Sequence, residues 1–279
     1  MTDKTATGWE RDNRTHFDEI VATYNKARWE YPVELYSDIM AYLQTGDKKA
    51  VEIGAGTGIA TAPFINAGYS VTAVEMGVNM AAFIKNKFRN DKNFNVIVSD
   101  FESVDLPHNA YDLAYAASAF HWVDAKTGCP KVFNLLKSGG TFALFRNNAV
   151  PLDDNILHEE IQGVYKKYYY KNYKPFPRPI RVMDMSAEDF LAPMEVHRGF
   201  RFESMEAYGF ESVTMKLYKT SKTYSAEAYL TLLDTYSDHR ALPDDDRAAL
   251  YTGIKEAILR HGNQHELCFI FQLYMGRKP

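Results

Sequence analysis

A glycine-rich turn near residue 54 constrains the fold of this chain more than any other feature. Residues 51–58 read VEIGAGTG, so an apolar strand runs directly into a turn that carries Gly54, Gly56 and Gly58. Glycine adopts backbone angles that other residues avoid, and it lets main-chain N–H groups at the start of a helix approach a ligand closely. The segment therefore predicts a strand, a ligand-binding turn and a helix over residues 57–66.

Strands and helices continue to alternate from about residue 48 to residue 148. Apolar runs predict strands at 50–54, 70–75, 94–98, 111–116 and 141–145, with further helices at 79–88 and 126–136. Helices of about 10–15 residues between strands are typical of right-handed crossovers in a parallel sheet. The pattern predicts a doubly wound α/β fold whose sheet is covered on both faces.

The pattern changes after residue 148. Residues 150–205 contain five of the eleven prolines, and two later strand-like segments lack a crossover between them and could add an antiparallel edge to the sheet. We interpret residues 1–279 as a single domain. Its predicted parts are a core at 15–147, sheet-completing strands at 210–219 and 265–276, and a lid made of residues 150–205 together with the helices of 225–262.

Composition and charge exclude several classes of protein. Apolar residues make up 46% of the 279 residues and charged residues 24%, as in an ordinary soluble domain. The formal net charge of -4 gives no general attraction to nucleic acid or to a membrane surface. No run approaches the ~18 apolar residues of a membrane span, and the two cysteines, Cys129 and Cys268, are too few for a zinc or disulfide framework. We expect a cytoplasmic protein, monomer or homodimer, without a metal ion.

An acidic residue follows the second predicted strand at a position suited to a nucleoside. Glu75 ends that strand, and a carboxylate there can accept both ribose hydroxyls of a ligand bound across the first two strands. The glycine spacing G-x-G-x-G is one residue shorter than the dinucleotide pattern, and the phosphate-loop pattern G-x-x-x-x-G-K-[ST] is absent. The spacing disfavours a nicotinamide-dependent oxidoreductase, which stays an alternative.

Taken together, these motifs resemble the class I S-adenosylmethionine-dependent methyltransferases. The resemblance rests on the acidic residue and glycines of 52–58, on Glu75, and on Ser99-Asp100-Phe101 after the third strand. The details resemble the group called methyltransferase type 11, which includes trans-aconitate methyltransferase-like proteins. They are YNKARWEYP at 24–32, AFHWV at 119–123 and LKSGGTF at 136–142, with Trp29 where this group usually has proline. The strong resemblance covers about residues 15–147.

The resemblance implies that S-adenosylmethionine is the cofactor and assigns a role to each matching residue. Gly54, Ala55, Gly56 and Gly58 would border its methionine part. The nucleoside would be held by Glu75 at the ribose, Met76 at the adenine ring, Asp100 at the adenine amine with the Phe101 backbone nearby, and Ala117 beneath the ligand. Tyr24 and Arg28, four residues apart on a predicted helix, would close the carboxylate end.

Methyl transfer from a sulfonium is an in-line displacement, so the protein must align acceptor and methyl group and exclude water. The expected activity is transfer to a small-molecule acceptor, for example a carboxylate. His121, just after the fourth strand, is the candidate general base for a hydroxyl or amine acceptor. The alternative is that His121 only packs the pocket wall or caps the next helix.

The segment 165–181 holds six basic residues and no acidic one, with five tyrosines interleaved. It suits a lid that binds an anionic substrate, a contact with nucleic acid, or an exposed helix face with tyrosines packed beneath it. The negative net charge and the absence of an N/D-P-P-Y/F segment disfavour nucleic acid. A non-catalytic S-adenosylmethionine-binding module and an RNA methyltransferase remain the alternatives to a small-molecule enzyme.

Overall fold

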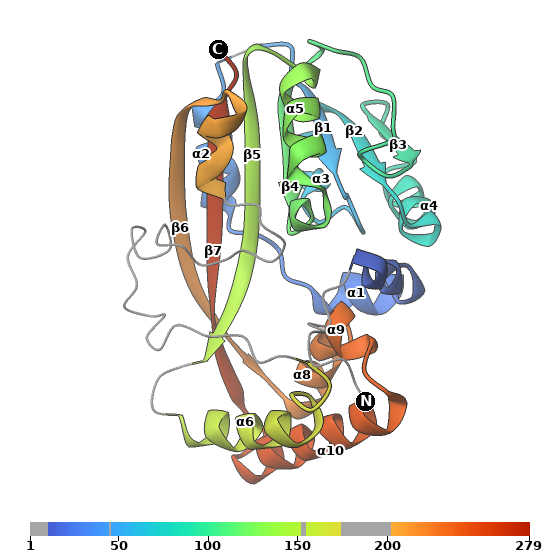
Figure 1. Ribbon diagram of the computed structural model, residues 1–279, viewed down its shortest axis with the longest axis vertical. Helices are drawn as coiled ribbons and strands as arrows, with labels where there is room; N and C mark the ends of the chain where they lie inside the picture. Colours follow the sequence, from blue (N-terminus) through green and yellow to red (C-terminus); the bar gives the residue numbers. More distant parts are fainter. Residues whose placement is uncertain (1–10, 45, 152–154, 174–201) are drawn as a thin grey trace. The chain divides into compact units, whose positions relative to one another are not determined.

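The computed structural model describes residues 11–44, 46–151, 155–173 and 202–279 (Figure 1). The chain divides into two units, which are described separately. The helical unit comprises residues 1–28, 148–185 and 219–270, and the sheet unit comprises residues 29–147, 186–218 and 271–279. Three long strands, β5, β6 and β7, have residues in both ranges.

Seven strands form one mixed sheet in the order β3-β2-β1-β4-β5-β7-β6. The strands are β1 (Lys49–Ile53), β2 (Ser70–Glu75), β3 (Phe94–Val98), β4 (Tyr111–Ala117), β5 (Leu136–Pro151), β6 (Glu211–Tyr224) and β7 (His265–Arg277). The first five are parallel, whereas β7 runs antiparallel between β5 and β6 (Figure 1). This arrangement confirms the predicted doubly wound α/β fold with an antiparallel C-terminal strand.

The strand register brings the ends of the parallel strands to one edge. Glu75 of β2 pairs with Val98 of β3, and Ala117 of β4 pairs with Phe145 of β5. The strand order reverses between β1 and β4, and ligands of open α/β sheets bind at the carboxyl edge beside such a reversal. The turns that follow β1 to β4 therefore form the region in which the candidate site has to lie.

Helices of the sheet unit bury one apolar face each. They are α2 (Val33–Tyr42), α3 (Thr61–Asn66), α4 (Val78–Lys87) and α5 (Ala125–Leu135), with the short 3-10 helices η2 (Phe120–Trp122) and η4 (Phe202–Tyr208). In α4, Met80 and Ile84 lie four residues apart and are both buried, as the 3.6-residue period requires. The middle of the sheet is fully buried, with Val51 and Ala114 at 0% exposure.

The helical unit is built from helices of very different length. They are η1 (Arg11–Glu19), α1 (Val21–Ala27), α6 (Ile156–Tyr168), α8 (Ala226–Leu233), α9 (Ser237–Arg240) and α10 (Asp244–Arg260). The side chain of Asn155 caps α6 and that of Ser225 caps α8, because each accepts a backbone N–H three residues later. No helix among the described residues is long and apolar enough to cross a membrane.

Several predicted boundaries are wrong for identifiable reasons. The helix expected from residue 57 begins only at Thr61, because Gly58 at φ +72° keeps residues 57–60 in turns. The strand expected at 141–145 spans 136–151, since residues 136–140, including two glycines, already lie inside the strand. The division into core, lid and completing strands stays a prediction, and residues 174–201 of the proposed lid lie outside the described residues.

Candidate active site

The glycine turn packs closely against two neighbouring segments. A Cβ at Gly54 would lie 2.6 Å from the Cβ of Ala119, and one at Gly58 would lie 2.8 Å from Ile84 and Phe88. A Cβ at Gly56, by contrast, would meet no described atom within 4 Å, although φ there is +55°. The turn is therefore pressed against the protein at Gly54 and Gly58, while at Gly56 the backbone has room beside it for a ligand.

Glu75 is fixed to this turn by two backbone donors. Its carboxylate, 8% exposed, accepts the N–H of Gly56 at 2.7 Å on Oε2 and the N–H of Gly77 at 2.8 Å on Oε1. An ionised carboxylate offers about four acceptor positions, which is the chemistry that the hydroxyl donors of a ribose require. The structure thus joins the predicted ribose-binding residue directly to the predicted glycine turn.

Glu52, which the sequence analysis left without a role, lies fully buried beneath the turn. Its Oε2 accepts hydrogen bonds from Thr61 Oγ1 at 2.5 Å and from Tyr115 Oη at 2.9 Å. Burial raises the pKa of Glu52 to about 8, against the effect of those hydrogen bonds, and the charge of Glu75 acts in the same direction as burial. In the sequence, a single acidic residue inside an otherwise apolar strand was the sign that Glu52 has a special role.

The predicted adenine-side residues lie after β2 and β3. Met76 is half-buried between Glu75 and Gly77, and Asp100 follows β3 by two residues. The carbonyl of Asp100 accepts the N–H groups of Ser103 and Val104, which fixes the turn. Phe101 is 4% exposed and packs into the core of the sheet unit, so its side chain has a structural role, and a contact of its backbone with the cofactor stays a prediction.

The end of β4 holds Ala117, Ser118 and the short helix η2 with His121. Ser118 has φ +52°, and its Oγ lies 2.8 Å from the hydroxyl of Tyr31. His121 is half-buried, with its ring 5.2 Å from that of Trp122. Tyr31 belongs to the YNKARWEYP motif, but no pattern in the sequence indicates that it reaches the end of β4.

Tyr24 and Arg28 belong to the helical unit. The Arg28 guanidinium lies 4.8 Å from the ring centroid of Tyr24 and 4.6 Å from that of Tyr236, and its Nη2 donates to the carbonyl of Thr235 at 2.7 Å. These two cation–π contacts and the hydrogen bond hold the guanidinium in place. That these two residues close the carboxylate end of the cofactor stays a prediction.

The tyrosine-rich segment is described only as far as residue 173. Tyr165, Tyr169 and Tyr173 are buried, whereas Lys166 and Lys167 are exposed. The hydroxyl of Tyr165 meets His239 Nε2 at 2.7 Å, and that of Tyr169 donates to Asp238 at 2.5 Å. This described part supports the packed-tyrosine interpretation. Lys174, Arg178 and Arg181 lie outside the described residues.

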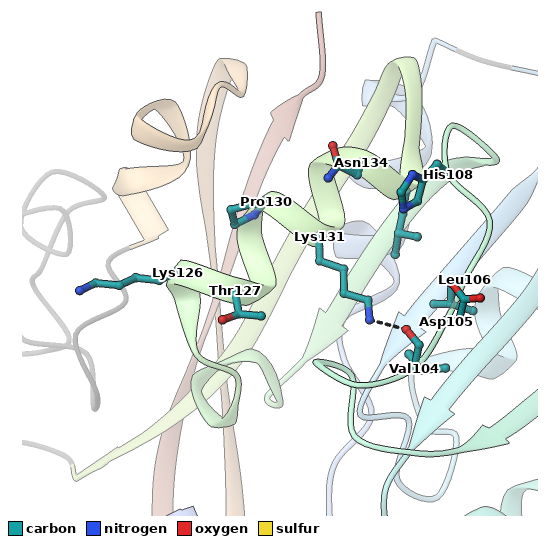
Figure 2. A pocket seen from close by; sticks show the side chains of 10 residues that line it. Val104, Asp105, Leu106, His108, Lys126, Thr127, Pro130, Lys131 and Asn134 are labelled. Carbon is teal, nitrogen blue, oxygen red and sulfur yellow. Dashed lines mark hydrogen bonds between the residues drawn. The ribbon is translucent and has the colours of Figure 1, made fainter.

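An open pocket of about 520 Å³ lies beside α5 and the segment 104–108 (Figure 2). Lys131 crosses it and donates to the carbonyls of Val104 and, at 3.2 Å, Glu102. None of the predicted site residues lines this pocket, so we do not assign the cofactor to it. Over the described residues, no group of three or more histidine, cysteine or acidic side chains could hold a metal ion.

Comparison with known proteins agrees with this geometry. Residues 51–144 match the family model of a methyltransferase domain. An uncharacterized methyltransferase of Schizosaccharomyces pombe is 24% identical over 249 residues, which is 87% of this chain and 86% of that protein. A protein of Saccharomyces cerevisiae named as a probable S-adenosylmethionine-dependent methyltransferase is 30% identical over 128 residues, 44% of each chain.

The fold is also that of solved methyltransferases. Phosphoethanolamine N-methyltransferase 2 of Haemonchus contortus, solved with phosphomonomethylethanolamine and S-adenosylhomocysteine, superposes with a TM-score of 0.53 at 12% identity. The superposition covers 99% of this chain and 61% of that one. The trans-aconitate group stays a prediction. The domain match over residues 51–144, the relatives and the sheet order together support a class I S-adenosylmethionine-dependent methyltransferase.

Proposed function

We propose that this methyltransferase acts on a small molecule with an anionic group, a carboxylate or a phosphate, and that it binds its cofactor at the carboxyl edge of β1 to β3. We choose an anionic acceptor because of the residues that surround Arg146. Its Nε donates to Oε1 of Gln272 at 2.7 Å, and Gln272 is 1% exposed on β7. A buried amide thus orients a guanidinium, a group that binds carboxylates and phosphates through paired hydrogen bonds.

Arg146 lies on β5 beside the carboxyl end of β4, where the acceptor would meet the methyl group. It follows Phe145, whose carbonyl accepts the N–H of Ser118 at 2.8 Å, directly past the end of β4. On this fold, the structure from Haemonchus contortus holds phosphomonomethylethanolamine, which is a small phosphorylated acceptor. That likeness gives the proposal a precedent for a phosphorylated acceptor on this fold.

The cofactor, when bound, supplies an activated methyl group, so the protein mainly binds, orients and excludes water. The backbone around Gly56, the oriented carboxylate of Glu75 and the turn at Asp100 would hold the nucleoside and the methionine part. A carboxylate acceptor is already nucleophilic and needs no base. His121 would serve as a base only for a hydroxyl or amine acceptor.

The cofactor assignment is tested by isothermal titration with S-adenosylmethionine, S-adenosylhomocysteine and NADH. We expect one-site binding of both sulfur nucleosides, weakened about 10- to 100-fold by Glu75→Ala, since hydrogen bonds to a charged group are lost. Glu34→Ala, at an exposed acidic position of α2, is the matched control. Binding of NADH alone would overturn the assignment.

The acceptor is tested with small carboxylic acids and phosphate monoesters, each paired with its uncharged amide or ester, by following S-adenosylhomocysteine release. Arg146→Gln should lower kcat/KM for the acids about 10- to 100-fold, and Arg146→Lys should lose less because the charge remains. Arg89→Gln, at an exposed arginine, should change nothing. Equal turnover of acids and their uncharged partners, or methylation of RNA alone, contradicts the proposal.

A further inference from the structure

A serine in a left-handed conformation stands where β4 reaches the carboxyl edge of the sheet. Ser118 has φ +52°, a region that glycine enters freely and residues with a side chain rarely adopt. Strained residues persist where surrounding contacts hold them, and they gather at functional sites. The contacts that hold Ser118 therefore indicate what the strain maintains.

The N–H of Ser118 donates to the carbonyl of Phe145, and its side chain contacts the hydroxyl of Tyr31, a residue 87 positions earlier in the chain. Tyr31 Oη and Ser118 Oγ are 2.8 Å apart. The tyrosine ring packs edge-on against Phe145, with centroids 4.8 Å apart, and against Phe271 at 5.6 Å. Because these neighbours fix the ring, Tyr31 presents its hydroxyl to Ser118 from a rigid support.

The turn that contains Ser118 and Ala119 packs against the glycine turn of residues 54–58. A Cβ placed on Gly54 would come within 2.6 Å of the Cβ of Ala119, the residue after Ser118. On its other side, the N–H of Gly54 donates to the carbonyl of Val74 in β2 at 2.8 Å. Gly54 is therefore fixed between β2 and the turn after β4, and any movement of Ser118 passes to it through Ala119.

We infer that Tyr31 and Ser118 are positioning residues whose hydroxyl pair locks the turn after β4 against Gly54 and keeps the glycine turn in its cofactor-binding shape. The inference rests on the proposed cofactor site. Both residues act through Ala119 and Gly54. If the pair only stabilised the fold, cofactor affinity and melting temperature would change together, whereas positioning predicts that affinity changes independently.

Four variants separate these effects: Tyr31→Phe, Ser118→Ala, the double variant, and Ser118→Gly. Titration with S-adenosylhomocysteine should show about 3- to 10-fold weaker binding for each of the first two, the usual effect of one lost hydrogen bond. The double variant should be no weaker than either single one, because the same bond is lost. Ser118→Gly should melt at or above the wild-type temperature, since glycine accepts φ +52° without strain, yet bind more weakly.

Tyr42→Phe is the matched control, because it also removes one tyrosine hydrogen bond of the sheet unit, to the carbonyl of Ser212 at 2.7 Å. It should leave the affinity for S-adenosylhomocysteine unchanged. Wild-type affinity in Tyr31→Phe or in Ser118→Gly, or additive losses in the double variant, would overturn the inference and leave the proposed function intact. Absence of binding by the wild-type protein would instead overturn the cofactor site itself.

Discussion

Glu52 shows how burial of a single residue sets its protonation. The carboxyl lies on β1 at 1% exposure, with hydrogen bonds from Thr61 and Tyr115. Burial disfavours its charged form and raises its pKa to about 8 from an ordinary 4.5. Because the folded protein holds this proton more tightly than the unfolded chain, Glu52 adds stability below pH 4.5 that is lost as the pH rises toward 8.

Glu52→Gln should remove that part of the pH dependence. Glutamine is neutral at every pH, and its carbonyl can still accept from Thr61 and Tyr115. Wild-type stability should fall relative to the variant between pH 4.5 and 8, by at most about 1.4 kcal/mol per pH unit, and level off above. Urea unfolding of both proteins at several pH values measures this difference. Parallel stability curves would show that Glu52 is not buried in its neutral form.

At the scale of elements, the turn between β1 and α3 is held by α4. Lys87, in the last turn of α4, donates to the carbonyls of Thr57 at 3.0 Å and Gly58 at 3.1 Å. Burial of the ammonium lowers its pKa, with Glu52 and Glu30 opposing the shift. A helix that follows β2 thus secures the turn that follows β1.

Lys87→Met should weaken binding of S-adenosylhomocysteine about 3- to 10-fold, because two hydrogen bonds to the turn are lost. Lys87→Arg should restore most of the affinity, since its guanidinium also donates to carbonyls. Lys85→Met, at an exposed lysine two residues earlier in α4, provides the control for titration calorimetry. A loss of the same size in Lys85→Met would attribute the effect to charge alone.

Gly58→Ala and Gly56→Ala should differ in their effects. Both place alanine at positive φ, which costs about 1 kcal/mol, but only at Gly58 would the new Cβ also clash with Ile84 and Phe88. Gly58→Ala should therefore lower the melting temperature more, whereas Gly56→Ala should mainly weaken cofactor binding. Thermal unfolding and titration of both variants provide the test, and equal melting temperatures would contradict it.

Elements with a clear period were predictable from the sequence. The strands at 70–75 and 94–98 have the bounds that the apolar pattern indicates. The first residue of the helix expected over 57–66 was not predictable, because the backbone conformation of Gly58 depends on a close contact with α4 that no local pattern contains. Glu75 and the glycines were predicted together, and the structure joins them by one hydrogen bond.

At the scale of the whole molecule, one buried carboxyl group in each unit contributes stability with an opposite dependence on pH. In the helical unit, the pKa of Asp238 lies below the ordinary 3.8. Burial alone would raise it, but the charge of His239 and hydrogen bonds from His239 and Tyr169 outweigh burial. Asp238 therefore adds stability above pH 3.8 that is lost as the pH falls further. The contributions of Glu52 and Asp238 to the stability of the protein are therefore both fully present only between pH 3.8 and 4.5.

Asp238→Asn should destabilise the helical unit at pH 7 by about 3 kcal/mol, because it removes one partner of a buried charged network. Hydrogen exchange of peptides from residues 226–240 should speed up, and the difference from wild type should narrow below pH 3.8. Asp245→Asn, at an exposed position of α10, is the control. Unchanged exchange in Asp238→Asn would show that the network contributes no stability.

The contacts that the sequence did not reveal join residues far apart in the chain. Tyr31 and Ser118 are separated by 87 positions, and Arg146 and Gln272 by 126. A pattern read over neighbouring residues reports the local period and the turn chemistry, but the partner of a side chain across the sheet is set by the packing of the whole unit. For that reason the motif residues were predictable, and their supporting contacts were not.

The place of β7 in the sheet has a consequence for how the protein is made. A ribosome releases β5 and then β6 before it releases β7, the strand that lies between them. Until β7 emerges, the edges of β5 and β6 that it later covers are unpaired, and such edges are prone to join other chains. The α10 helix is synthesised between β6 and β7, so slow synthesis of this part of the chain would prolong the exposure of these edges and favour aggregation.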